Sequence, residues 1–519
     1  GRNGQNLGGS SCYVYDIDDL PSSSNCKHLV GCGVKGNISS DFWERLARNQ
    51  NLKSVTFANE NYPCQLKGRL PDYNSSAAEF QSLTTLNLMD CRLSGTIPPS
   101  LGNLTKLTAL LALGNSNTNA GEGNTFSGQI PSWLGSLTAM NKTGKLVLAN
   151  LSLTGHIPSS LGKGAVHLIL NNNRLGGAIH KNLLTKNRVL EVNNNNLADE
   201  LPSDIGSGVT LWANNNHLWG PIPAALFEGD SRVLDLTNNM LGSTLPAAFT
   251  NSSVSLWAAH NKISGSLPTG IRVDGRTVIL DHNVLVGPIP GNLSLENDGN
   301  FSVSFNKLSG PLPNITVQSG MVNASYNQLT GPIPSSWFDN GNIDLTSNSL
   351  RGPFPAALGT GSVNLWAANN KIYGTLPVNE FQVQNRALVL DNNLLTGTLP
   401  DGMTIVSGFL SVSNNQLVGT LPSTFGWVSA TLNASNNMLT GQIPGSLMKN
   451  AVVVDLTNNS MDGTLPGQLR YSSASFFLAN NRIAGTIPYE PFFMDDRILL
   501  LDNNLLTGSL PSDITIGTG

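Results

Sequence analysis

The segment Val453-Val454-Asp455-Leu456-Thr457-Asn458-Asn459-Ser460-Met461-Asp462-Gly463-Thr464-Leu465-Pro466 contains the pattern that decides the fold. Written as a template it is LxLxxNxLxGx(L/I)P, and it returns about every 22 residues through most of the chain. Val454 and Leu456 alternate with Asp455, so the two apolar residues point inward from a short strand while the aspartate points outward. One such coil cannot bury its own apolar face, so its stability depends on stacking against neighbouring coils.

The rest of the template has separate structural roles. The amide of Asn459 is short enough to reach backbone groups of adjacent turns where the chain leaves the strand. Gly463 permits a backbone angle that a side chain would resist, and Pro466 then sets an extended path. We therefore predict a leucine-rich repeat solenoid of about 21 coils. Its parallel sheet forms a concave face, and extended, polyproline-like or short 3-10 segments form the convex face.

The asparagine of the template forms a column that we call the ladder. The sequence assigns a structural role to these side chains because each can bond to backbone groups that would otherwise have no partner at a buried turn. The ladder residues are Asn173, Asn195, Asn216, Asn239, Asn261, Asn283, Asn306, Asn327, Asn348, Asn370, Asn393, Asn415, Asn437, Asn459, Asn481 and Asn504.

Composition excludes several classes of function. Among the 519 residues only 12% are charged and the net charge is −4, without a basic run, so nothing favours nucleic-acid binding. No stretch of 18 or more apolar residues occurs, so this portion has no predicted membrane span. We find no nucleophile elbow, zinc-binding helix or phosphate loop, and so predict no enzyme, no cofactor and no metal site. The chain starts at Gly1 without a signal-like segment, which we interpret as a processed chain or a fragment.

The template divides the chain into three regions. Residues 1–31 lack the repeat and are predicted to form an N-terminal cap with cysteines. Residues 32–154 hold irregular repeats, with residues 115–124 predicted as an inserted surface loop. Residues 155–519 hold regular 22-residue repeats with a five-repeat superperiod of about 110 residues, and their C-terminal end carries no recognisable cap.

The five cysteines lie near the N-terminus, which suits an oxidising compartment. Cys12 and Cys26 fall outside the template, and we expect them to form a disulfide. Cys32, Cys64 and Cys91 occupy ladder positions and are expected to be buried thiols. The alternatives are a bond from Cys12 or Cys26 to Cys32, or a free thiol that links two chains, because the count is odd.

Twelve N-x-S/T sequons point to the same compartment. If Asn323 and Asn433, on equivalent outward strand positions, both carry glycans, sugar would obstruct the concave face and favour a decorated structural rod. We interpret the chain as a secreted or cell-surface glycoprotein. The candidate N-glycosylation sites are Asn37, Asn74, Asn103, Asn141, Asn150, Asn251, Asn292, Asn300, Asn314, Asn323, Asn433 and Asn458.

The segment Leu83–Thr105, with Cys91-Arg-Leu-Ser-Gly-Thr-Ile-Pro at its centre, resembles the plant-type extracellular leucine-rich repeat. This is the L-T-G-x-I-P family of polygalacturonase inhibitors and receptor-kinase ectodomains. The resemblance covers about residues 29–515 and is specific for fold rather than for function. The family unit has about 24 residues, whereas most coils here have 22 and lose two on the convex side. We therefore predict a straighter rod than a horseshoe.

A second period runs along the outward strand positions. Trp257, Trp366 and Phe477 recur there at five-coil intervals, and Trp212 precedes them. Aromatic rings on an exposed strand can bind a ligand or a second copy of the chain, or they can simply cover half-buried neighbours.

The same period brings acidic and histidine residues to the surface. Asp235, Asp344 and Asp455 also recur, but they are too far apart to form a calcium cage, so we interpret them as solvated carboxylates. His260 and His282 precede ladder residues and are interpreted as surface histidines, because a two-histidine site lacks further metal ligands.

Two functions fit these observations. The first is an extracellular, glycosylated structural or adhesion protein that associates head-to-tail with itself, or with neighbouring surface glycoproteins, into a fibre or surface layer. The alternative is a cell-surface recognition ectodomain that binds a protein, peptide or polysaccharide on its concave face.

Overall fold

The computed structural model describes residues 11–16, 26–57, 64–72, 80, 82–116, 123–185, 188–229, 233–317, 319–338, 341–355, 363–377, 382–401, 403–423, 426–447, 451–472, 474–488 and 498–510. The chain divides into two compact units, Gly1–Ser264 and Gly265–Gly519, and we describe each by itself. No helix in the described part of the chain has both the length and the apolar character that a bilayer-crossing segment needs. The predicted uncapped C-terminal end falls on residues 511–519, outside the described residues.

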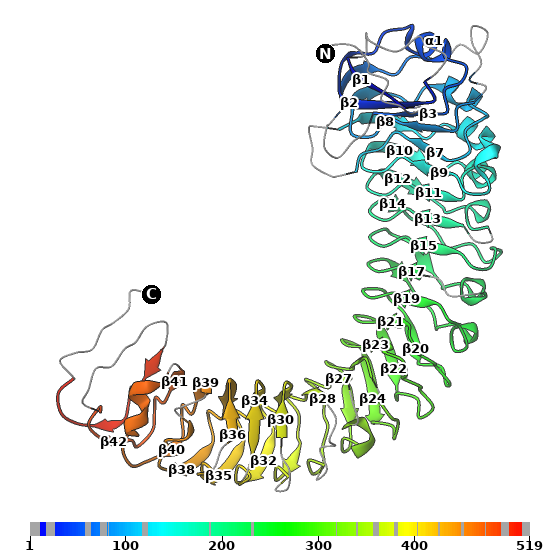
Figure 1. Cartoon of the computed structure of the whole chain (residues 1–519). Coiled ribbons are helices and arrows are strands. Elements are labelled where there is room, and N and C mark those ends of the chain that lie inside the picture. The colour runs from blue at the N-terminus through cyan, green and yellow to red at the C-terminus, as the bar shows by residue number, and fades with distance from the viewer. Residues whose placement is uncertain are drawn as a thin grey trace. The chain divides into compact units, whose positions relative to one another are not determined.

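One short strand per coil pairs in parallel with the strand of the next coil, and these strands form the main sheet of each unit (Figure 1). A strand of three residues is sufficient for each coil, since the middle residue points into the core and its neighbours point to solvent. We call the solvent side of this sheet the strand face. In the first unit its strands are β1 (Ser11–Asp16), β2 (His28–Asn37), β3 (Ser54–Thr56), β5 (Thr85–Asn87), β7 (Leu110–Ala112), β9 (Lys145–Val147), β11 (His167–Ile169), β13 (Val189–Glu191), β15 (Thr210–Trp212), β17 (Val233–Asp235) and β19 (Ser255–Trp257). In the second unit they are β21 (Thr277–Ile279), β23 (Asn300–Ser302), β25 (Met321–Asn323), β27 (Gly341–Asp344), β28 (Val363–Trp366), β31 (Ala387–Val389), β34 (Phe409–Ser411), β37 (Ala430–Asn433), β39 (Ala451–Asp455), β41 (Ser475–Phe477) and β43 (Leu499–Leu500).

A second column of short parallel strands follows the ladder position. In the first unit it comprises β4 (Gln65–Arg69), β6 (Arg92–Gly95), β8 (Thr125–Gln129), β10 (Ser152–His156), β12 (Arg174–Gly177), β14 (Asn196–Leu197), β16 (Trp219–Gly220) and β18 (Met240–Leu241), with β20 (Ser264–Ser266) at the unit boundary. In the second unit it comprises β22 (Val284–Gly287), β24 (Lys307–Pro311), β26 (Gln328–Thr330), β29 (Tyr373–Gly374), β32 (Leu394–Gly397), β35 (Gln416–Thr420), β38 (Met438–Gly441), β40 (Ser460–Met461), β42 (Ala484–Gly485) and β44 (Leu505–Leu506). Most template glycines have positive φ, for example 79° at Gly441, which explains the preference for glycine at this position.

The return segments of the coils hold short helices and one small sheet. After the template proline the chain either stays extended or makes one 3-10 turn, which confirms the predicted solenoid fold. The helices are α1 (Phe42–Ala47) and the 3-10 segments η2 (Pro99–Asn103), η3 (Ser132–Ser136), η4 (Thr138–Met140), η5 (Ser159–Lys163), η6 (Lys181–Leu183), η7 (Ala224–Phe227), η8 (Ala247–Phe249), η9 (Ser335–Phe338) and η10 (Gly467–Tyr471). The small sheet comprises β30 (Gln382–Gln384), β33 (Thr404–Val406) and β36 (Gly426–Val428). The predicted straightness of the rod concerns the arrangement of the whole chain and stays a prediction.

The ladder side chains join consecutive coils in the way the sequence suggests. The Oδ1 atom of Asn415 accepts the N–H of Leu395 in the preceding coil at 3.0 Å. Its Nδ2 atom donates to the carbonyl of Leu390 in that same coil at 3.0 Å, and to two carbonyls of its own coil. One amide thereby satisfies backbone groups on both sides of a coil boundary, where a strand has just ended and water is excluded.

Two of the predicted buried thiols are instead a disulfide. Cys64 and Cys91 are bonded at an S–S distance of 2.02 Å, with their Cα atoms 4.6 Å apart, so that prediction was wrong. They occupy ladder positions of adjacent coils, and stacked coils bring those positions within disulfide reach. Cys12 and Cys26 form the second disulfide, which is the pair the sequence favoured. The side chain of Cys32 lies outside the described part of the chain.

The predicted surface loop 115–124 is wrong at both ends. Asn115 and Asn124 are buried and bonded to each other, and residues 117–122 between them lie outside the described residues. Asn124 acts as a ladder residue, because it accepts the N–H of Leu93 at 3.0 Å and donates to the carbonyl of Leu88 at 2.7 Å. The insertion separates this residue from its strand in sequence while the ladder keeps it in place.

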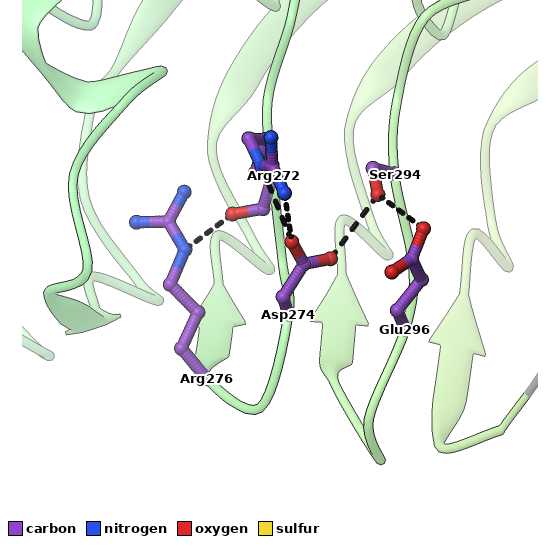
Figure 2. Close-up of polar contacts among 5 residues, drawn as sticks. All are labelled: Arg272, Asp274, Arg276, Ser294 and Glu296. Carbon is purple, nitrogen blue, oxygen red and sulfur yellow. Dashed lines mark hydrogen bonds and ion pairs between the residues drawn. The ribbon is translucent and has the colours of Figure 1, made fainter.

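A polar cluster lies on the return segments that lead into β21 and β23 (Figure 2). Arg272 donates to Oδ2 of Asp274 through Nε at 3.1 Å and through Nη2 at 2.8 Å, and Ser294 donates to Oδ1 at 3.1 Å. The pKa of Asp274 is held below its ordinary value of 3.8, first by the hydrogen bonds from Arg272 and then by Ser294. Arg276 is buried and donates to the carbonyl of Arg272, and burial lowers its pKa to about 10.

We predict that Asn415→Ala destabilises the protein by about 1–3 kcal/mol, because buried backbone groups of two coils lose their partner. Urea denaturation measures the change. Gln416→Ala is the matched control, since this neighbouring side chain is exposed. Equal stability of Asn415→Ala and Gln416→Ala would contradict the structural role of the ladder.

We predict that Asp274→Asn lowers stability near neutral pH and that this loss disappears in acid. The folded-state pKa of Asp274 is depressed, so its contribution is complete above the unfolded value of 3.8 and disappears as pH falls through the lower folded value. Urea midpoints of wild type and variant, compared between about pH 6 and about pH 2, should therefore converge at the acid end. A difference that is independent of pH would contradict this assignment.

Candidate functional site

The four candidate aromatic residues all lie on the strand face. Trp212, Trp257, Trp366 and Phe477 are the last residues of β15, β19, β28 and β41, and each is half-buried with part of its ring in solvent. Their position follows from the two-residue period of a strand, because the core residue before each ring points inward. The rings are therefore placed to contact a ligand or a partner as well as their neighbours.

Each five-coil block places an aspartate directly beside an aromatic residue on the neighbouring strand. Asp235 is in register with Trp257, and Asp344 is in register with Trp366. The third such pair is Asp455 with Phe477. We call these the Asp–aromatic pairs. The sequence interpretation treated the aspartates as solvated carboxylates. The strand register shows that each lies beside an aromatic residue of the next coil.

The aspartates of these pairs are held in place by their own coils. Oδ1 of Asp344 accepts the N–H of Thr346 at 2.9 Å, and Oδ1 of Asp455 accepts the N–H of Thr457 at 2.9 Å. In the described part of the chain neither carboxylate has a salt-bridge partner. A fixed carboxylate beside an aromatic ring is a suitable site for a cation.

A hollow of about 250 Å³ opens on the strand face at one of these pairs. Its lining residues are Met321, Asn342, Asp344 and Trp366, from β25, β27 and β28. The Asn342 amide is fixed because its Oδ1 accepts a hydrogen bond from Asn364 at 2.7 Å. Five coils later Thr431 and Val453 stand in the places of Met321 and Asn342, so the lining of this hollow is not copied there.

Other positions that recur with the five-coil period have a structural role. Oδ1 of Asp391 accepts the hydroxyl of Ser411 at 2.5 Å, and both the N–H and the hydroxyl of Ser413 at 2.7 Å. Asp281 makes the equivalent three bonds to Ser302 and Ser304. These serines are buried, so the aspartates link adjacent coils instead of facing a ligand.

An exposed stack of rings lies beside the ladder in the second unit, and the sequence analysis did not predict it. The ring of Phe305 lies 4.1 Å from His282 on one side and 4.1 Å from Tyr326 on the other, with interplanar angles of 10° and 9°. Phe305 and Tyr326 have positive φ, which is unusual for bulky residues. In other coils this position is mostly asparagine, so the only signal in the sequence was the loss of asparagine there.

The candidate glycosylation sites differ in exposure. Asn323 and Asn433 are half-buried on the strand face, where each Oδ1 accepts bonds from the serine two residues later. The exposed sequon asparagines are Asn37, Asn103, Asn141, Asn251, Asn292, Asn314 and Asn458. Asn150 and Asn300 are half-buried, and Asn74 lies outside the described residues. Glycans on the strand face therefore stay a prediction.

Within the described ranges, no group of three or more histidine, cysteine, aspartate or glutamate side chains is placed to hold a metal ion. In the first unit, Nε2 of His167 lies 2.6 Å from Oε1 of Glu191 on the adjacent strand, and no third such side chain of the described part joins them.

Comparison with known proteins agrees with this fold. Residues 82–104 match the Leucine Rich Repeat family model. A comparison with curated protein sequences gave no match. The chain is a leucine-rich repeat protein with coils of about 22 residues, structurally similar to the ectodomains of plant receptor kinases.

Three solved structures illustrate the similarity. The leucine-rich repeat ectodomain of the Arabidopsis receptor kinase HAESA, in complex with an N-terminally extended IDA peptide hormone, is 28% identical with a TM-score of 0.64, over 95% of this chain and 85% of that chain. HAESA in complex with IDA and the co-receptor SERK1 gives 24% identity and a TM-score of 0.60, over 92% and 86%. The plant peptide hormone receptor RGFR1 in complex with RGF2 gives 23% identity and a TM-score of 0.62, over 93% and 84%.

We predict that Asp391→Ala destabilises the protein by roughly 1.5–3 kcal/mol, because two buried serines lose a charged acceptor. Asp401→Ala is the control, since it removes an exposed carboxylate at a turn in the same unit. Urea denaturation of the two variants measures the difference. Identical midpoints would show that Asp391 does not link the coils.

Proposed function

We propose that this chain is an extracellular recognition domain that binds a peptide on its strand face. The observation that carries the proposal is the recurrence of the Asp–aromatic pairs, in register on neighbouring strands, with part of each ring in solvent. Aromatic residues and fixed charges of this kind are enriched at the centres of binding surfaces. The HAESA ectodomain, 28% identical, was solved with a peptide hormone, which supports a peptide as the ligand class.

An extracellular location fits the covalent chemistry of the first unit. Two disulfides, Cys12–Cys26 and Cys64–Cys91, are typical of proteins that fold in an oxidising compartment. Seven sequon asparagines are exposed, namely Asn37, Asn103, Asn141, Asn251, Asn292, Asn314 and Asn458, and these are the positions that we propose for N-glycans.

The hypothesis of a fibre-forming structural protein is the less supported of the two. The similar structures described above are receptors bound to peptides, and they give no support to head-to-tail association. Self-association therefore stays a prediction from sequence, as does the assignment that the chain is not an enzyme. We propose no cofactor.

We predict that the protein, secreted from eukaryotic cells so that its disulfides form, selects peptides from a displayed library of random 12-residue sequences. For a selected peptide, Trp366→Ala and Phe477→Ala, both in the second unit, should each weaken binding roughly 5- to 30-fold, the range expected of interface anchor residues. Biolayer interferometry measures the affinities.

The matched control is Trp219→Ala. Trp219 is 46% exposed but belongs to β16, away from the strand face, so its loss should leave the affinity unchanged. Failure to select any peptide would contradict the proposed function. So would an equal loss of affinity in all three variants, because binding would then not depend on the strand face.

A further inference from the structure

Two departures from the repeating pattern fall on the same three coils of the second unit. One is the hollow lined by Met321, Asn342, Asp344 and Trp366 on β25, β27 and β28. The other is the end of the ring stack at Tyr326, which follows β25 by three residues. Neither feature is copied in the block five coils later, so both belong to one local surface rather than to the general architecture.

The residue before each ladder asparagine has positive φ, and these residues form a column along the coils. Phe305 and Tyr326 stand in this column, where most other coils have asparagine. In the first unit this column is mostly asparagine, with Asp90 and His260 as exceptions, and the asparagine amides bond from coil to coil, as from Asn172 to Asn150 at 2.7 Å and from Asn194 to Asn172 at 2.6 Å. Asparagine tolerates positive φ better than other side chains, so it causes the least backbone strain at this position. At φ values of 50° and 52°, Phe305 and Tyr326 occupy a conformation that bulky residues avoid.

Burial of the rings does not explain why phenylalanine and tyrosine stand at these two positions. Phe305 is 41% exposed and Tyr326 is 47% exposed, so neither contributes to the core as a buried ring does. Unfavourable backbone conformations that persist at the surface cluster at sites of function. The ring stack is therefore a candidate for contact with a ligand.

Within the described residues the stack ends at Tyr326, and no ring stacks on the second face of this side chain. Phe305 covers its other face, and the next residue of the column is Ser347, whose hydroxyl is too small to cover a ring. In the block five coils later the equivalent residues are Asn436 and Asn458, which bond to each other at 2.7 Å and leave no such space. Coils repeat at roughly 4.8 Å, which is enough for one planar group to continue the stack above Ser347.

The hollow on the same coils has the chemistry of a cation site. Oδ1 of Asp344 is engaged by the Thr346 N–H, while in the described part of the chain Oδ2 accepts no hydrogen bond. The Trp366 ring and the Met321 thioether provide apolar walls, and no lysine or arginine is among the lining residues. A volume of about 250 Å³ corresponds to roughly eight water molecules, so one long side chain fits.

We propose that this surface recognises a peptide segment that carries a basic side chain together with an aromatic one. The arginine or lysine enters the hollow, pairs with Asp344 and stacks on Trp366, while the aromatic ring of the same peptide covers the second face of Tyr326. This inference rests on the proposed function, since it names the ligand chemistry of the same strand face.

The test uses the same library of displayed 12-residue peptides and the whole secreted chain. Selected peptides should combine at least one arginine or lysine with at least one tryptophan, tyrosine or phenylalanine. For such a peptide, Asp344→Ser should weaken binding roughly 10- to 100-fold, the range for a lost charge-assisted hydrogen bond. Serine already stands at the equivalent strand positions Ser302 and Ser411, so this variant is compatible with the fold.

Two further variants separate the ring from the charge. Tyr326→Asn places in the column the residue that the next block has there, and it should weaken binding roughly two- to tenfold without loss of stability. Tyr326→Phe keeps the ring and should bind as wild type does. Asp401→Ser removes an exposed carboxylate elsewhere in the unit and should have no effect. Circular dichroism and thermal melting of each variant confirm that it is folded.

The outcomes distinguish this inference from the proposed function. Selected peptides without basic residues, or affinities unchanged by Asp344→Ser, would overturn the assignment of the hollow while leaving peptide recognition in place. An affinity that Tyr326→Asn leaves unchanged would overturn the role of the ring. Failure to select any peptide would overturn both the proposed function and this inference.

Discussion

The structure depends on one hydrogen-bonding arrangement, in which an asparagine side chain bonds two consecutive coils at once. In a representative case Asn437 accepts the N–H of Leu417 at 3.0 Å and donates to the carbonyl of Val412 at 3.0 Å, both in the preceding coil. A coil of about 22 residues is too thin to cover its own core, and its chain turns where water cannot reach the backbone. The ladder supplies the missing partners, so each coil is complete only when the next one is present.

This constraint also determines which side chains become neighbours on the strand face. The ladder fixes the register of neighbouring strands, and the register determines which outward side chains lie side by side. Some of these neighbours reinforce the stack, as Asp391 does with Ser411 and Ser413. Others leave polar atoms toward solvent, as in the pair of Asp344 and Trp366. Aspartates at different positions of the coil thus differ in role. Asp391, two residues after its strand, bonds to buried serines, whereas Asp344, the last residue of its strand, keeps Oδ2 without a hydrogen bond in the described part of the chain.

Sequence reasoning recovered the features that depend on one coil and missed those that depend on two. The strand, the glycine with positive φ and the ladder asparagine are all readable within a segment such as Val453–Pro466. The Cys64–Cys91 disulfide was missed because 27 residues separate the two cysteines, which hides that stacking places their Cα atoms 4.6 Å apart. Asn124 was missed because an insertion moves it away from its strand in sequence, although its hydrogen bonds are those of a ladder residue.

The candidate site shows the same division. The outward position of the tryptophans and their recurrence with the aspartates followed from the strand and five-coil periods, but the hydrogen bonds that fix the aspartates did not. The stack of Phe305 on Tyr326 could not be predicted, because it contradicts the local preference for asparagine at positive φ. Local preferences describe what a single residue favours in isolation. A surface selected for binding departs from them wherever contact with a ligand outweighs the cost.

Amide hydrogen–deuterium exchange of Asn415→Ala tests the central claim most directly. The N–H of Leu395 donates to Asn415, whereas the N–H of Leu439 donates to Asn459, which the variant leaves intact. The account predicts that exchange accelerates at Leu395 and its neighbours while Leu439 keeps its wild-type protection. Unchanged protection at Leu395 would contradict the claim that the asparagine side chain holds the preceding coil in place.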